Sequence, residues 1–215
     1  MGPTPRSTVQ RLPERGRYDA PTIHAILDEA YICTVAFVVE GSPIAIPTIH
    51  ARIDDTLYLH GSNVSRMLST LAGGVECCVT ATVLDGLVLA RSVFHSSMNY
   101  RSVVLFGRAQ PVTDRDEKVR AMRAVTEHVL PGRWDEVRQP NAKEIAGTQI
   151  VSITIDDASA KIRTGAPVDE EGDLVLDIWS GVVPLTLMPG APIADRPELE
   201  TPGSVRAVTT TPRGH

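Results

Sequence analysis

Apolar side chains recur at every second position in several short segments of the chain. This is the period of a strand with one buried face, because successive side chains of a strand point to opposite sides. Turn residues such as Gly41-Ser42-Pro43 and Asp54-Asp55 separate these segments. We therefore expect strands, antiparallel where they follow one another directly, over residues 31–39, 44–53, 56–60, 75–82, 84–90, 102–111, 149–155 and 160–163.

Three segments repeat apolar residues every three or four positions and therefore predict helices. The first follows Asp19, the second covers residues 64–72 with Ser62 or Asn63 as its N-cap, and the third follows Asp114. The residues expected to face inward are Ile23, Ile26 and Leu27 in the first helix, Met67, Leu68 and Leu71 in the second, and Val119, Met122, Val125 and Val129 in the third.

Short, regularly spaced strands with few long helices favour a mainly β fold, a closed or nearly closed antiparallel barrel with peripheral helices. Prolines and charges without an apolar period mark residues 1–18 as an N-terminal arm. The barrel domain is expected over residues 19–188. Residues 189–215, rich in proline, glycine and acids, are expected to form a poorly ordered tail.

Charge and composition narrow the functional class. The chain has 215 residues and a net charge of −5 with acids and bases interspersed, which argues against a dedicated nucleic-acid surface. Cys33, Cys77 and Cys78 show no Cys-x-x-Cys spacing, so neither a disulfide framework nor a zinc cluster is expected. No signal peptide is visible and no apolar run reaches the roughly 20 residues that span a bilayer. We expect a soluble, cytoplasmic protein without a membrane partner.

The junction from Leu59 to Arg66 is the first candidate site. A helix N-terminus offers unpaired backbone N–H groups and a positive dipole end, which suit a phosphate. Gly61 would allow close backbone approach, Ser62 and Ser65 could donate hydrogen bonds, and Arg66 would supply the counter-charge. The alternative is an ordinary capped helix with a surface arginine. The glycine-rich nucleotide fingerprints are absent from the chain.

Histidines are the second candidates. His50, His60 and His95 lie on different strands or strand ends and could converge on a metal or on haem iron, but no cysteine or carboxylate stands at ligand spacing beside them. We therefore predict no metal site. A serine hydrolase is disfavoured because Ser62 lacks the Gly-x-Ser-x-Gly frame. His95 could serve as a general acid or base, since histidine titrates near neutrality.

A set of motifs spread over residues 14–187 resembles the pyridoxamine 5′-phosphate oxidase-like, FMN-binding split-barrel proteins, and within them the branch of the nitroimidazole-resistance flavoproteins. The motifs are Pro47-Thr-Ile-His-Ala-Arg, Leu57-Tyr-Leu-His-Gly-Ser, Ser65-Arg66, His95-Ser-Ser-Met-Asn-Tyr-Arg-Ser-Val and Trp179-Ser-Gly-Val-Val-Pro.

The resemblance implies a six-stranded antiparallel split β-barrel that forms a homodimer with FMN at the subunit interface. By resemblance, the isoalloxazine ring lies against Thr48, Ile49, His50 and Ala51. Ribityl and phosphate groups are held by His60, Gly61, Ser62, Ser65 and Arg66. Further flavin contacts come from Asn99, Tyr100, Arg101 and Ser102, with Trp179 closing the pocket.

The implied activity is an FMN-dependent oxidoreductase of a small molecule, with nitroreduction as the specific example. His95 would face the substrate side of the flavin, or alternatively cap the loop at Asn99. Asn63 stands where relatives often carry a basic residue, which weakens the phosphate assignment. The C-terminal arginine and histidine motif of true pyridoxamine phosphate oxidases is missing, so vitamin B6 oxidation is not expected. The alternatives are a flavin-binding protein without turnover, or a split-barrel protein that uses haem or a deazaflavin.

Overall fold

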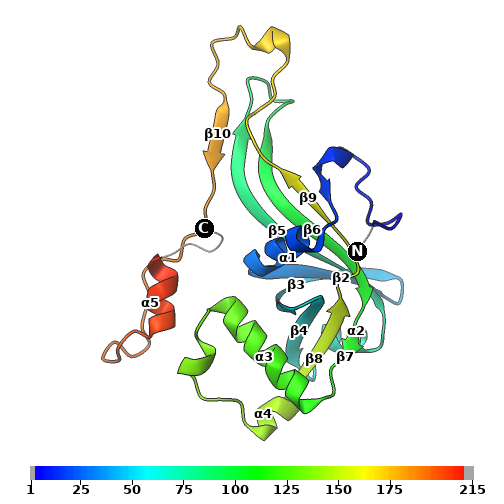
Figure 1. Ribbon diagram of the computed structural model, residues 1–215, viewed down its shortest axis with the longest axis vertical. Coiled ribbons are helices and arrows are strands. Elements are labelled where there is room, and N and C mark those ends of the chain that lie inside the picture. The colour runs from blue at the N-terminus through cyan, green and yellow to red at the C-terminus, as the bar shows by residue number, and fades with distance from the viewer. Residues whose placement is uncertain (1–2, 211–215) are drawn as a thin grey trace.

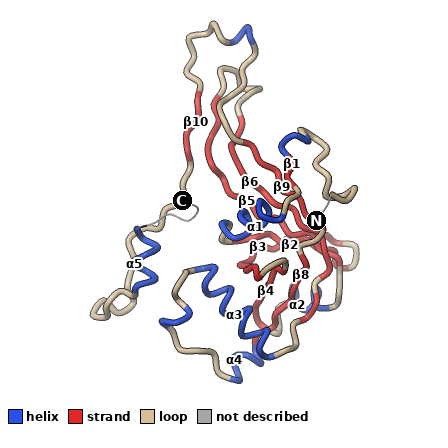
Figure 2. The backbone as a smooth tube through the Cα atoms, viewed as in Figure 1, coloured by secondary structure: helices blue, strands red, loops and turns tan. Residues whose placement is uncertain are grey.

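One continuous antiparallel sheet forms the centre of the molecule, and the structure, a computed structural model, describes residues 3–210 (Figures 1 and 2). Its strand order is β1-β9-β6-β5-β2-β3-β4-β8-β7, with β10 paired to the free half of β5. The strands are β1 (Gly16–Arg17), β2 (Ile32–Val39), β3 (Ser42–Ile53), β4 (Thr56–Ser62), β5 (Glu76–Leu89), β6 (Ser97–Arg108), β7 (Gln110–Pro111), β8 (Thr148–Thr154), β9 (Asp157–Arg163) and β10 (Gly181–Pro184).

Helices surround this sheet at its lower end and along one side (Figure 1). The α-helices are α1 (Ala20–Glu29), α2 (Arg66–Ala72), α3 (Arg115–Val129), α4 (Ala142–Gly147) and α5 (Gly203–Thr210); the 3-10 turns are η1 (Pro13–Arg15), η2 (Trp134–Glu136) and η3 (Glu171–Asp173). The mainly β, antiparallel architecture that the alternating pattern predicts is confirmed.

The β5–β6 hairpin is longer than predicted and projects beyond the rest of the sheet (Figure 1). The two segments expected over 75–82 and 84–90 form a single strand, β5, whose register shifts between Leu84 and Gly86. Strand β6 begins at Ser97, so the polar stretch Asn99 to Ser102 lies inside a strand rather than ahead of one. Pairing with both β5 and β9 holds these polar residues extended.

The main core lies between the curved sheet and helices α1 and α2. The predicted inward residues of these two helices are buried, as expected from their spacing. They pack with strand residues that are at most 1% exposed, among them Val35, Leu57, Leu59, Leu105 and Ile153. Burial of this set is the largest favourable contribution to folding.

Helix α3 confirms part of the predicted inward face, since Val125 is buried and Met122 packs against a buried cluster. Its buried residues are Ala121, Val125 and His128, whereas Val129 is 41% exposed. The ring nitrogen Nε2 of His128 bonds the Ala30 carbonyl at the end of α1. This long-range contact turns a polar residue inward and Val129 outward, so the prediction for Val129 was wrong.

The helix starts agree with the sequence in two cases out of three. Asp19 caps α1 and Asp114 caps α3, each through a backbone N–H three residues later. Helix α2 is capped by Ser65, not by Ser62 or Asn63. Strand β4 continues to Ser62, which pairs with Thr148 of β8, and this pairing delays the helix.

Both ends of the described chain contact the body of the protein. In the arm, Arg6 Nε donates to Asp157 Oδ2 at 2.5 Å. The guanidinium of Arg6 also lies over the aromatic ring of Phe106. Helix α5 occupies part of the segment expected to be poorly ordered, and Glu136 of η2 accepts from the backbone N of Ser204 at 2.9 Å. Long-range polar contacts of this kind leave no local signal in the sequence.

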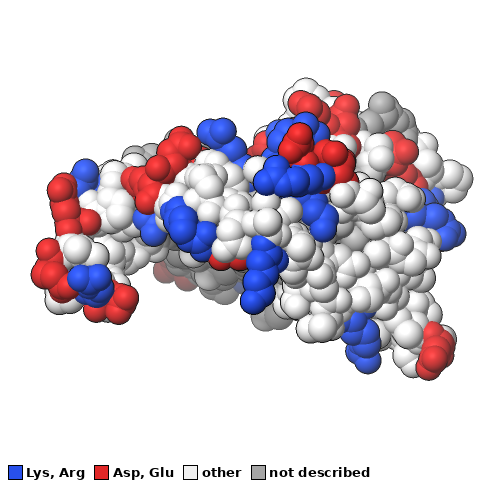
Figure 3. All heavy atoms as spheres, turned by 90° about the horizontal axis from the view of Figure 1, so that it is seen from below, with Lys and Arg blue, Asp and Glu red and all other residues white. Residues whose placement is uncertain are grey.

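Acidic and basic side chains are interspersed on the face shown in Figure 3, and a broad part of that face carries neither. Within residues 3–210, no helix has both the length and the apolar character needed to cross a membrane.

Candidate functional site

The residues predicted to form a site fall into two regions of the chain. One is the corner where β3 and β4 meet α2, which carries Thr48 to Ala51 and His60 to Arg66. The other is the β5–β6 hairpin with the segment before β10, which carries His95, Asn99 to Ser102 and Trp179. Figure 1 shows the far end of the hairpin directed away from α2.

The corner at α2 offers a close backbone approach and an available cation. A Cβ at Gly61 would lie 3.0 Å from Leu68 Cδ1, so glycine is required for α2 to pack against β4. The Arg66 side chain is exposed and has no ion pair within residues 3–210. A free guanidinium of this kind can bind phosphate bidentately.

His60 has no hydrogen bond or ion pair at either ring nitrogen within residues 3–210, unlike the other histidines described. Its Nδ1 is buried and has no hydrogen-bond partner in the part of the chain that is described. Burial lowers the pKa of His60, because removal from water penalises the imidazolium. A neutral imidazole without a partner is a competent ligand for iron and an available hydrogen-bond group for a cofactor.

Strand β3 passes from a partly exposed stretch to an enclosed one between Ile49 and His50. Thr48 and Ile49 are partly exposed, and the Thr48 hydroxyl has only a long contact, 3.4 Å, to its neighbour's carbonyl. Ala51 and His50 are fully enclosed, 1% and 0% exposed. Of the four predicted residues, Thr48 and Ile49 are therefore the ones whose side chains can meet a ligand.

A pair of buried histidines closes the end of α1. His50 Nε2 lies 2.8 Å from the Leu27 carbonyl oxygen, and His128 Nε2 lies 3.0 Å from that of Ala30. A carbonyl only accepts, so both Nε2 atoms carry hydrogen. The two rings stand 4.7 Å apart. His128 was not predicted as part of this region, and its only signal in the sequence was a polar residue on the last turn of a helix.

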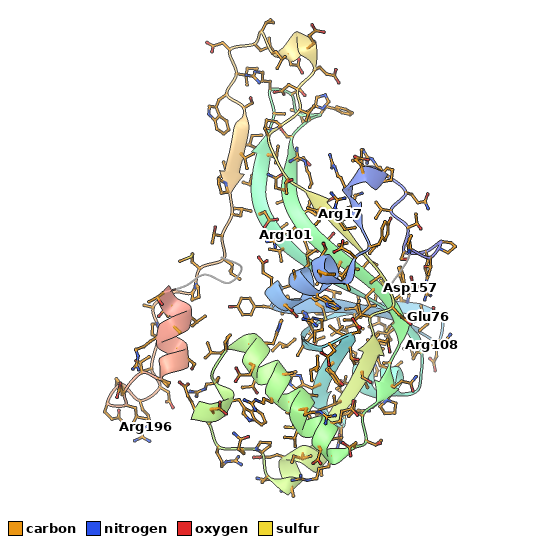
Figure 4. All side chains as sticks on the ribbon, viewed as in Figure 1. Arg17, Glu76, Arg101, Arg108, Asp157 and Arg196 are labelled. Carbon is orange, nitrogen blue, oxygen red and sulfur yellow. The ribbon has the colours of Figure 1, made fainter. Side chains whose placement is uncertain are left out.

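Arg101 is held by two carboxylates at the middle of the hairpin, close to α1 (Figure 4). Its Nε and Nη2 donate to Asp85 at 3.0 and 2.7 Å, and Nη2 donates to Glu29 at 2.7 Å, with Nη1 completing a fork on Glu29. The hydrogen bonds that Arg101 donates to Asp85, and then those to Glu29, raise the pKa of Arg101. Four of the five guanidinium N–H groups are thus already engaged by carboxylates, and neither acidic partner was predicted from the sequence.

The neighbouring hairpin residues also have protein partners. Asn99 is 8% exposed; its Nδ2 donates to the Gly165 carbonyl at 3.1 Å and its Oδ1 accepts from Arg163. The Ser102 hydroxyl donates to the Lys161 carbonyl at 3.3 Å, and Tyr100 pairs with Arg163 across to β9. Arg163, 7% exposed, is a buried cation that sequence inspection missed.

His95 lies in the loop at the tip of the hairpin. Its Nε2 is 3.2 Å from Glu170 Oε1, and its ring meets the edge of the exposed Phe94. Trp179 is 65% exposed, and its ring covers the backbone of Gly181 at the start of β10. Within one chain, His95 and Trp179 belong to the hairpin region and not to the α2 corner.

No group of three or more histidine, cysteine, aspartate or glutamate side chains in residues 3–210 is arranged to hold a metal ion. His50, His60 and His95 therefore do not converge on a shared ion within the described chain.

Comparisons with known proteins place the chain among flavin-related folds. A sequence model of the family described as pyridoxamine 5′-phosphate oxidase matches residues 19–162. The flavocytochrome Anf3 from Azotobacter vinelandii is 36% identical, with a TM-score of 0.86 and 96% of this chain and 97% of that chain covered. An FAD- and haem-binding protein from Mycobacterium smegmatis is 38% identical, with the same TM-score over 91% and 97% of the two chains.

A third similar structure is a putative 5-nitroimidazole antibiotic resistance protein from Bacteroides thetaiotaomicron. It is 21% identical with a TM-score of 0.57, over 68% of this chain and 86% of that chain, which shows a shared fold. No curated protein matched the chain.

Proposed function

This chain belongs to the pyridoxamine 5′-phosphate oxidase family, and on that premise we propose that it is a redox protein that binds a flavin together with haem. The resemblance read from the sequence motifs and the split-barrel fold it implied are confirmed. The sequence analysis considered haem only as a replacement for the flavin, whereas the proposal here has both cofactors bound to one protein.

The observation that carries the proposal is likeness over the whole chain. The two relatives described as a flavocytochrome and as an FAD- and haem-binding protein match more than nine-tenths of this chain. The nitroimidazole-resistance structure matches only about two-thirds of it. The relative described as an FAD- and haem-binding protein also favours FAD over the FMN that the motifs implied.

His60 is the residue that fits haem iron best. Of the five histidines in residues 3–210, His50 and His128 bond backbone carbonyls, while His24 and His95 lie beside Asp55 and Glu170. His60 is the one histidine in that range with no hydrogen bond or ion pair at either ring nitrogen. The sequence motifs assigned His60 to the ribityl chain of the flavin, whereas this proposal assigns it to the haem iron. The two assignments predict the loss of different absorption bands when His60 is replaced.

For the flavin, the residues that remain available are Thr48, Ile49, Gly61, Ser65 and Arg66. The exposed Arg66 would pair with a phosphate that also meets the backbone N–H groups at the start of α2. When bound, the flavin supplies two-electron and the haem one-electron chemistry, and the protein supplies orientation and electrostatics. His95, beside Glu170 at the hairpin tip, stays a predicted proton donor on the substrate side.

We include a second copy of the chain in the proposal, with cofactor sites at the interface. The outer face of β2 and β3 pairs Ile32 with Ile49, Ala36 with Ala45 and Val38 with Pro43. Ile32 and Val38 are 55% and 53% exposed. A contiguous apolar sheet face of this kind marks an interaction surface. A second subunit would also bring a hairpin to the α2 corner, joining the two regions.

The visible spectrum of the purified protein tests the cofactors. We expect flavin bands and a Soret band after addition of FAD and haemin. His60→Ala should lose or shift the Soret band and keep the flavin bands, whereas His95→Ala should leave both. Arg66→Ala should weaken flavin binding by about tenfold, because one charge-assisted phosphate contact is lost.

The proposal fails if neither cofactor binds. A Soret band unchanged in His60→Ala assigns the iron to another residue, and a flavin without haem returns the protein to the FMN-type oxidoreductase first implied. Nitroreduction stays a prediction. It requires that the reduced flavin is reoxidised faster by a nitroimidazole than in buffer, and an unchanged rate would exclude it.

A further inference from the structure

A cavity of about 570 Å³ lies between the end of α1, the middle of the β5–β6 hairpin and the segment after β10. One wall is formed by Ala30 and Ile32 with Val83 and Leu84 of β5. The opposite wall is the segment 184–187, which the backbone N of Leu185 fastens to the carbonyl oxygen of Asp85 at 3.1 Å. Its volume is that of a small-molecule pocket.

The cavity has an unbalanced charge at one end. The charged residues that line it are Glu29, Asp85 and Arg101, two acids against one base. The Arg101 side chain satisfies both carboxylates at once, with Asp85 at 2.7 and 3.0 Å. The group therefore carries a net charge of −1, and it is only partly exposed: 28%, 17% and 28% for the side chains of Arg101, Glu29 and Asp85.

The carboxylates keep acceptor capacity toward the cavity. Each carboxylate offers about four lone-pair directions, and the Arg101 contacts use two on Glu29 and two on Asp85. Four of the five N–H groups of Arg101 donate to the two acids, so an anion entering the cavity meets a net negative charge and only one remaining N–H, on Nη1. A protonated nitrogen meets a net negative charge and open lone pairs.

We propose that this cavity is a binding site for a small molecule with an apolar or aromatic body and a protonated nitrogen. The apolar body lies between the wall of Ile32 and Leu84 and the segment 184–187. The ammonium group lies at Glu29 and Asp85. Leu187, an apolar lining residue that is 71% exposed, gains burial when the ligand is bound.

This assignment goes beyond the proposed cofactors and does not depend on them. The flavin and haem residues proposed above lie at β3, β4 and α2, whereas the cavity is lined by α1, β5, β6 and the segment after β10. It also assigns Arg101 to holding the two acids in place. That role differs from the flavin contact implied by the sequence motifs.

Three probes with the same ring and different head groups test the charge selection: 2-phenylethylammonium, 2-phenylethanol and phenylacetate. Binding to the purified full-length protein is measured by ligand-observed NMR or calorimetry, with and without added FAD and haemin. We expect the ammonium to bind about tenfold more tightly than the alcohol and the carboxylate not to bind, because a unit charge near a partly exposed net negative charge is worth about one order of magnitude.

Substitutions distinguish the contribution of the two carboxylates to binding from that of the apolar lining. Asp85→Asn should reduce ammonium binding to the level of the alcohol, and Glu29→Gln should do the same if the first variant is unstable. Asp116→Asn, an 81% exposed acid on α3, is the matched control and should change nothing. Thr82→Trp, at an exposed position lining the cavity, should abolish binding of all three probes.

Equal affinity for the ammonium and the alcohol would overturn the proposal, as would absence of binding by all three probes. Unchanged ammonium binding in Thr82→Trp would place the probe elsewhere and also overturn it. Loss of the Soret and flavin bands with intact ammonium binding would contradict the proposed cofactors and leave the cavity assignment standing.

Discussion

At the scale of single residues, burial determines the reactivity of the cysteine thiols. Cys33 is 1% exposed, and burial raises the pKa of its thiol to about 12; burial likewise raises the pKa of Cys77 to about 11. Only the thiolate reacts with alkylating and disulfide reagents. Raised pKa values and enclosure therefore both make these two thiols inert in the folded protein.

We predict that Cys33 and Cys77 resist iodoacetamide at pH 8 in the native protein and react once it is unfolded. For Cys33, the pKa shift alone lowers the thiolate fraction about a thousandfold relative to an ordinary cysteine. Peptide mass spectrometry of labelled samples, native against urea-unfolded, measures the rates. Native labelling of Cys33 at the unfolded rate would contradict the burial described here.

At the scale of secondary-structure elements, the closeness of strand packing determines how much stability a glycine-to-alanine substitution removes. A Cβ at Gly107 of β6 would lie 2.8 Å from Cγ2 of Ile153, a residue of β8 that is 1% exposed. Real Cβ atoms do not approach this closely, so one of the two strands must move. Gly147 at the end of α4 offers the opposite case, since nothing lies within 4 Å of its added Cβ.

Gly107→Ala is therefore predicted to destabilise the protein by about 1–3 kcal/mol, the usual cost of overpacking. Gly147→Ala should cost nothing or stabilise slightly, because alanine favours a helix. Chemical denaturation gives both free energies of unfolding. Equal effects of the two substitutions would mean that β6 and β8 are not in contact at this point.

At the scale of the whole molecule, one exposed sheet face bears on whether two copies of the chain associate. The outer face of β2 and β3 is mostly apolar and includes the exposed residues Ile32, Val38 and Ile49. Ala45 lies at the middle of this face, paired with Ala36. A charge placed there would have to lose its hydration in any interface that covers the face.

We predict a dimer for the native protein and a monomer for Ala45→Asp, measured by size-exclusion chromatography with light scattering. Ile193→Asp, at a 98% exposed apolar position in the tail, is the matched control and should remain a dimer. A monomeric native protein would contradict an interface site. A dimeric Ala45→Asp protein would move the interface to another face.

Local patterns in the sequence were sufficient for much of the fold. Alternation identified the strands, helical spacing identified the buried stripes of α1 and α2, and Asp19 and Asp114 were correct caps. The scattered motifs were sufficient for the family. These features depend on residues near one another in the chain, because side-chain direction follows from φ and ψ over a few positions.

The folded chain alone decides which polar groups meet. Arg101 pairs with Glu29, 72 positions away, and His128 turns inward to reach Ala30, 98 positions away. The arm joins Arg6 to Asp157 across 151 positions, beside Glu76 and Arg108 (Figure 4). Such pairings follow from how the sheet curves and which strands become neighbours. Composition and periodicity do not contain that information, so the partners of a charged residue, and with them its availability to a ligand, come only from the tertiary structure.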